Sequence, residues 1–134
     1  GRVAGSIAMK RIFESKLSVA LKSKVGLISS GYSQGLIDHF PELQTTAEKI
    51  ADAIDSIGPI NIQARVRGGR LIPFEINPRF SASTYMRAMA GFNEIDIYLR
   101  YLTNQSVTET PVLKPGYYLR TLDQAFVSKD ELVG

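Results

Sequence analysis

The sequence contains no cysteine and a single histidine, His39. The absence of cysteine excludes a disulfide framework, a thiol nucleophile and a zinc site built from thiolates. One histidine excludes metal sites that need several imidazoles and leaves little room for a histidine-based catalytic triad. The chemistry that remains open to this chain is chemistry that needs neither group.

Long apolar runs are also missing. No stretch of the sequence approaches the roughly 20 apolar residues that a transmembrane helix requires. The chain opens on Gly1, without an initiator methionine or the basic and apolar regions of a secretory signal, and enters patterned sequence at once. We therefore expect a cytoplasmic piece of a longer protein that has no membrane partner.

The charge balance excludes little. Sixteen basic residues against thirteen acidic ones give a formal net charge of +3 and a pI of about 9.3. The basic residues are spread along the chain, whereas nucleic-acid binders concentrate them in a stripe with aromatic platforms. We expect no nucleic-acid partner, although the pI alone keeps such a domain as a third hypothesis. A modestly positive cleft for a phosphate-bearing ligand is compatible with this balance.

Periodicity predicts an α+β domain spanning 1–134, with a mainly antiparallel sheet and helices packed on one face. The first half should contain a hairpin of strands 2–13 and 17–28, a small polar loop at 29–35 and a helix over 41–57. The second half should contain strands 60–67 and 71–77, helices 83–90 and 94–103, a loop at 104–116 and a strand at 117–127.

The second hairpin brings a set of polar side chains to one face. Ile62 shares a face with Ala64 and Val66 on the first strand, and Ile72, Phe74 and Ile76 share one on the second. Matching these faces requires an odd number of loop residues, so we predict a three-residue loop, Gly68-Gly69-Arg70. This register sets Gln63 opposite Glu75 and Asn61 opposite Asn77.

The resulting surface carries Asn61, Gln63, Arg65, Glu75 and Asn77. One carboxylate with several amide oxygens suits a hard cation such as magnesium, which keeps waters and takes further ligands from nucleotide phosphates. Arg79, just past Pro78, could add a forked donor for a phosphate or carboxylate. The ordinary alternative is an exposed sheet face on which Arg65 lies beside Glu75.

The stretch from Gly58 to Leu102, with G-P-I-N-I-Q-A-R-V, then L-I-P-F-E-I-N-P-R-F-S and A-G-F, resembles the ATP-grasp enzymes. It is most similar to their carbamoyl-phosphate-synthase-like branch. The resemblance implies that 1–134 is a fragment, the C-terminal subdomain of an ATP-grasp fold. Its missing partner would be the N-terminal half, which clamps the nucleotide and has no counterpart in this sequence.

The resemblance also implies roles and substrates. Glu75 would bridge two Mg²⁺ (or Mn²⁺) ions, Asn77 would hold one of them, and Gln63 would hold the other or contact the ATP phosphates. Arg79 would be catalytic and hold the transferring phosphoryl group or the acyl phosphate. Ser29 would lie in the loop near the phosphates, where the carbamoyl-phosphate enzymes tend to have histidine. The reaction would activate a small carboxylate with ATP for attack by an amine or ammonia.

Several alternatives stay open. The domain could be an ATP-grasp-like module that binds a nucleotide or a protein without chemistry. His39 is typical of a surface or capping histidine, and Lys10 and Arg11 either are solvated strand charges or face a phosphate. The aromatic and methionine side chains of the expected helix 83–90 and the expected strand 117–127 fit packing against the core. These are Tyr85, Met86, Met89, Tyr117, Tyr118 and Phe126.

Overall fold

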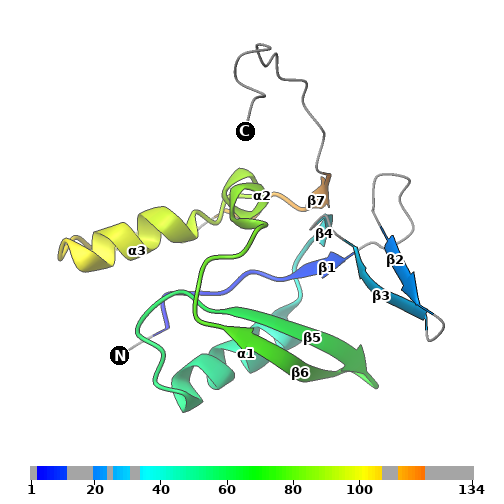
Figure 1. The fold of residues 1–134 in the computed structure, drawn as a ribbon. Helices are drawn as coiled ribbons and strands as arrows, with labels where there is room; N and C mark the ends of the chain where they lie inside the picture. Colours follow the sequence, from blue (N-terminus) through cyan, green and yellow to red (C-terminus); the bar gives the residue numbers. More distant parts are fainter. Residues whose placement is uncertain (1–2, 12–19, 24–25, 31–33, 107–111, 120–134) are drawn as a thin grey trace, which may run out of the picture.

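The computed structural model describes residues 3–11, 20–23, 26–30, 34–106 and 112–119, and they form an α+β structure (Figure 1). Its elements run in the order β1 (Met9–Arg11), β2 (Ala20–Ser23), β3 (Gly26–Ser30), β4 (Gly35–Ile37), α1 (Pro41–Ala53), β5 (Asn61–Arg67), β6 (Arg70–Asn77), α2 (Thr84–Met89), α3 (Glu94–Leu102) and β7 (Gly116–Tyr118). Every strand pairing among these elements is antiparallel, which confirms the predicted fold class.

The strands form three small sheets. β4 is the central strand of β1-β4-β7, while β2 pairs with β3 and β5 pairs with β6. The prediction of a first hairpin from strands 2–13 and 17–28 was wrong, because β1 pairs with β4 and the second stretch divides into β2 and β3. The apolar odd positions of that stretch break at Ser23, which is where β2 ends. The predicted loop 29–35 was also wrong at both ends, since Ser29 and Ser30 close β3 and Gly35 opens β4.

The buried core of the described residues lies between the β1-β4-β7 sheet and α2. Ile37 of β4 meets Met86 and Ala90 there, and Ile7, Met9, Leu113 and Tyr118 pack around them. This confirms the packing roles predicted for Met86 and Tyr118. Tyr85 and Met89 are 76% and 52% exposed and Tyr117 is exposed as well, so their predicted packing was wrong. Phe126 lies outside the described residues. Tyr85 is adjacent to Met86 on the helix and Tyr117 is adjacent to Tyr118 on the strand, so neither shares a face with its packed neighbour.

The three helices in the described part of the chain end in the same way. The residue after each C-cap has a positive φ: +50° at Asp55 after α1, +99° at Gly91 after α2 and +54° at Asn104 after α3. At the end of α2, the Phe92 N–H donates to the Arg87 carbonyl (2.9 Å) and the Gly91 N–H donates to the Ala88 carbonyl (3.0 Å). This pair of bonds is the Schellman motif, which satisfies carbonyls that a helix end would leave unpaired. The same motif ends α1 at Ala53, before the predicted end at 57.

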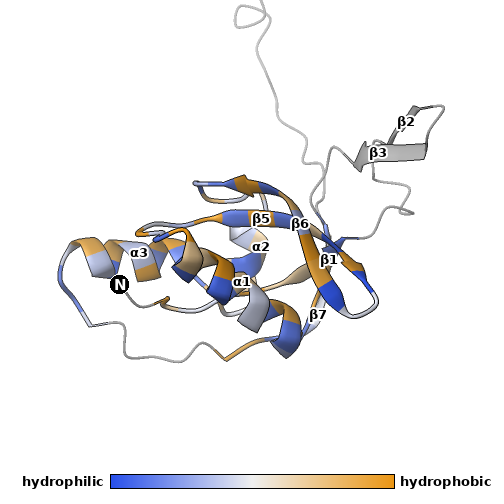
Figure 2. Cartoon of the chain, turned by 90° about the horizontal axis from the view of Figure 1, so that it is seen from below, coloured by the Kyte–Doolittle hydropathy of each residue, from blue (hydrophilic) through white to orange (hydrophobic). Residues whose placement is uncertain are grey.

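The helices are short and mixed in polarity. α1 and α3 carry both apolar and polar residues along their lengths (Figure 2). α3 begins at an Asn93 cap, whose side-chain oxygen accepts a hydrogen bond from the Asp96 N–H at 3.2 Å. Among the described residues, no helix combines the length and apolar composition that a bilayer crossing needs.

Candidate functional site

The candidate site lies where β5 begins and β6 ends. The register of this hairpin sets Gln63 opposite Glu75 and Asn61 opposite Asn77, as predicted. Directly opposed residues of an antiparallel pair share a face of the sheet. Four side chains that bear amide or carboxylate oxygens therefore lie together at the open end of the hairpin.

The loop that produces this register differs from the prediction. Arg67 pairs with Arg70, so the loop holds only Gly68 and Gly69, with φ of +55° and +76°. Two positive φ values are what a tight primed turn requires, and two glycines supply them without strain. The register of Gln63 with Glu75 requires one residue more than this turn provides. That residue is Phe74, which forms a bulge between the pairs Gln63–Glu75 and Ala64–Pro73.

The bulge has a local chemical reason. Pro73 has no N–H to give to the ladder, so the pairing is already interrupted at this position. On the turn side of the bulge the register places Ile72 opposite Arg65 and Leu71 opposite Val66. The predicted common face of Ile72, Phe74 and Ile76 was therefore wrong. Toward the open end, Ile76 faces Ile62 as predicted.

Glu75 and Asn77 are directly connected. The Asn77 Nδ2 donates a hydrogen bond of 2.8 Å to the Glu75 Oε1. The bond uses the amide nitrogen of Asn77 and does not use its side-chain carbonyl oxygen, the atom that a cation would bind. Glu75 is exposed, while Gln63 and Asn77 are half-buried. One carboxylate and two amide oxygens on an accessible face fit a magnesium ion that completes its shell with waters and phosphate oxygens.

Arg79 follows this face after a sharp turn. Its N–H donates to the Asn77 carbonyl at 2.8 Å, and its Nη1 donates to the Phe80 carbonyl at 2.9 Å. The side chain is exposed, and four of its five N–H donors are not used by that bond. The ring of Phe80 meets Tyr98 of α3 edge-on, with centroids 6.1 Å apart. The segment that carries Arg79 is thus tied to β6 on one side and to α3 on the other.

The remaining candidates lie elsewhere. Ser29 is in β3, opposite Leu21, in a different sheet from Glu75, and its side chain lies outside the described part of the chain. Its predicted contact with phosphates stays a prediction. His39 is exposed just before α1, as expected for a surface histidine. Its backbone N–H donates to the Asp38 carboxylate at 2.8 Å. Lys10 is exposed on β1 and Arg11 is half-buried beside it.

A charged network that sequence reasoning missed supports the start of β5. Arg87 of α2 donates from Nη2 to the Asn61 Oδ1 (3.1 Å) and from Nη1 to the Glu94 Oε2 (3.1 Å). The Thr84 hydroxyl donates to the other oxygen of Glu94. The side chains of Arg87 and Glu94 are only 13% and 12% exposed. Arg87 and Glu94 are seven residues apart in different helices, and Asn61 is further away in the sequence. No local sequence pattern therefore predicts that these three side chains meet.

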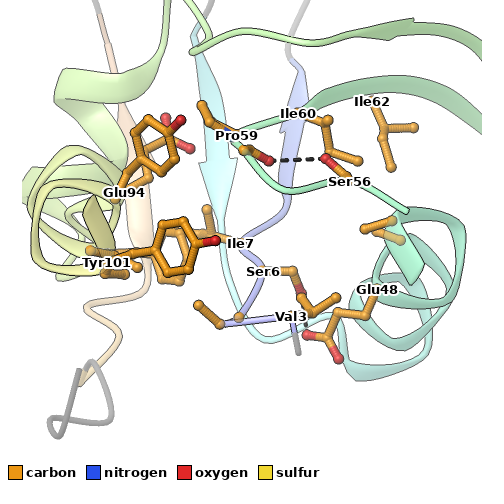
Figure 3. A pocket seen from close by; sticks show the side chains of 18 of the residues that line it. Val3, Ser6, Ile7, Glu48, Ser56, Pro59, Ile60, Ile62, Glu94 and Tyr101 are labelled. Carbon is orange, nitrogen blue, oxygen red and sulfur yellow. Dashed lines mark hydrogen bonds between the residues drawn. The ribbon is translucent and has the colours of Figure 1, made fainter. Parts of the chain in front are cut away.

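A cavity of about 420 Å³ lies on the opposite face of β5 from Gln63. Figure 3 shows Glu94 and Tyr101 of α3 on one side of it and Ile60, Ile62 and Glu48 on the other. Most of its lining is apolar, and Arg87 and Glu94 stand at its wall. Within the described residues, no group of three or more histidine, cysteine, aspartate or glutamate side chains converges on a point. A metal site built on one carboxylate is consistent with that result.

A family model described as "ATP-grasp in the biosynthetic pathway with Ter operon" matches residues 14–125. Because this match covers most of the chain, the protein belongs to that ATP-grasp family. No curated protein and no solved structure matches the chain.

Membership confirms the predicted resemblance at the level of the superfamily. It indicates an ATP-binding function of the ligase type, in a family that generally uses ATP and Mg²⁺. The matched range contains Gln63, Glu75, Asn77 and Arg79.

Proposed function

We propose that this domain supplies the magnesium-binding half of an ATP-grasp ligase that joins a carboxylate to an amine or ammonia, as in the carbamoyl-phosphate-synthase-like branch. Glu75, Asn77 and Gln63 would hold Mg²⁺ with the ATP phosphates, and Arg79 would hold the transferring phosphoryl group. The N-terminal half of the clamp would come from a preceding subdomain of the parent protein.

The proposed reaction has two steps. A carboxylate oxygen attacks the γ-phosphorus of ATP, the bond to the bridging oxygen breaks, and ADP leaves. The amine nitrogen then attacks the acyl carbon, phosphate departs with the former carboxylate oxygen, and the nitrogen loses a proton. Phosphoryl transfer of this kind depends on positioning and charge neutralisation. A chain without a thiol and with one imidazole can supply both.

The observation that carries the proposal is the register of the hairpin. Gln63 stands opposite Glu75, and Glu75 accepts a hydrogen bond from Asn77 on the same face. The bulge at Phe74 absorbs the one extra residue of β6 between the pairs Gln63–Glu75 and Ala64–Pro73. Bulges are over-represented next to active sites, where they re-aim side chains, so the position of this bulge beside Glu75 supports a functional face.

The test is ATP turnover by the full-length parent carrying Glu75→Gln. We expect ADP release to fall at least 100-fold, because the substitution removes the one carboxylate charge among the proposed ligands Gln63, Glu75 and Asn77. Glu42→Gln, at an exposed glutamate in the first turn of α1, is the matched control and should turn over normally. Unchanged turnover in Glu75→Gln would refute the assignment. Magnesium-dependent ATP binding without ADP release from the unmodified parent, with any of a panel of carboxylates and amines, would instead indicate a non-catalytic module.

A further inference from the structure

We propose that Arg87 is a positioning residue for the magnesium site, acting through Asn61. This inference rests on the proposed function and adds to it a residue that touches neither metal nor nucleotide. The guanidinium of Arg87 contacts two elements at once: the first residue of β5 and the first residue of α3.

The geometry suits a rigid connection. Nη1 of Arg87 is committed to Glu94 at 3.1 Å and Nη2 to Asn61 at 3.1 Å, so the planar fork fixes the distance between its partners. Both members of the ion pair are nearly buried, where a charge pair is screened less by water than at the surface. Glu94 is held in turn by the Thr84 hydroxyl. The start of β5 is therefore anchored to the α2–α3 corner.

The anchor lies next to the proposed ligands. Asn61 is paired with Asn77 across the hairpin, and Asn77 is bound to Glu75. A shift of the β5 start would move Gln63, two residues on, relative to Glu75. Arg87 also occupies the Asn61 Oδ1, so this oxygen is engaged and is not offered to a cation. Asn61 and Gln63 share a face of the hairpin, but Asn61 is held by Arg87 whereas Gln63 is a proposed ligand of the ion.

The test compares two variants of the full-length parent, Arg87→Met and Arg87→Lys. Residues that orient metal ligands from behind typically change metal affinity or activity by 10- to 100-fold when they are removed. We expect both variants to raise the Mg²⁺ concentration for half-maximal ATP turnover at least 10-fold. Arg87→Lys should keep near-native thermal stability, because it retains a charge for Glu94, but a single ammonium does not reproduce the fork.

Arg100→Met is the matched control. Arg100 is also ion-paired, to Asp96 at 2.8 Å, but it lies half-exposed on α3, and this pair is formed within that helix. It should leave the Mg²⁺ dependence unchanged. A folded Arg87 variant whose half-saturating Mg²⁺ lies within twofold of the unmodified protein would overturn the proposal. If Arg87→Met does not fold, Arg87→Lys decides.

Glu75→Gln, measured in the same assay, separates the two claims. If it abolishes turnover while the Arg87 variants behave normally, the positioning role fails and the proposed function stands. If Glu75→Gln turns over ATP normally, the proposed function fails. In that case the side-chain amide signal of Asn61 in Arg87→Met, measured by NMR, still reports whether the contact exists.

Discussion

Replacement of Gly91 by alanine combines two costs, a strained backbone conformation and a steric clash. Gly91 ends α2 with φ of +99°, and a Cβ built on it would lie 2.2 Å from the Val112 carbonyl oxygen. Left-handed backbone costs an L-residue about 1–2 kcal/mol. Relieving the clash would also move the 112–114 segment, whose Lys114 N–H donates to the Ala90 carbonyl at 2.9 Å. Losing that bond costs about 1 kcal/mol more.

Gly91→Ala should therefore lower the free energy of unfolding by about 2–3 kcal/mol in urea denaturation. Gly68→Ala is the matched control, because Gly68 has φ of +55° but no atom within 4 Å of its built Cβ. It should lose only the backbone term, about 1 kcal/mol. The entropy that alanine removes from the unfolded chain is common to both variants and cancels. Equal losses in the two proteins would refute the claim that the Val112 contact matters.

Two further predictions concern backbone devices. Asp55→Gly should raise the free energy of unfolding by about 0.5–1 kcal/mol. Asp55 follows α1 with φ of +50°, a conformation that costs an L-residue energy, and it places a negative charge at the negative end of the helix dipole. A lower free energy of unfolding in urea denaturation would contradict this prediction. Deleting Phe74 should remove the bulge while keeping Gln63 opposite Glu75, since the ladder then continues directly from Ala64–Pro73. Cross-strand NOEs between the backbones of Gln63 and Glu75 check it, and their disappearance would show that the bulge does more than absorb one residue.

The sequence predicted the polar face but not how the chain builds it. The predicted pairing of Gln63 with Glu75 required one residue beyond a two-residue loop, and this register was correct, although the common face of Ile72, Phe74 and Ile76 was not. The location of the extra residue was not accessible from parity, because a glycine pair satisfies a tight turn and Pro73 favours an interruption within the strand. Only the competition between these two local preferences places the bulge at Phe74.

The elements that depend on distant partners were harder to predict. β4 is three residues long and exists because β1 and β7 pair with it from opposite ends of the chain. The contact of Arg87 with Asn61 spans 26 positions, so no local pattern in the sequence predicts it. Periodicity reports which face of an element is apolar, and it carries no information about which element that face meets.

The proposed function depends most directly on where the metal binds. Mn²⁺ can stand in for Mg²⁺ and broadens the NMR signals of nearby protons, so titrating the full-length parent with Mn²⁺ and ATP locates the ion. We predict that the side-chain amide signals of Gln63 and Asn77 broaden first, and that Glu75→Gln abolishes this effect. Broadening centred on other residues, or broadening that persists in Glu75→Gln, would contradict the assignment of the ion to this face of the hairpin.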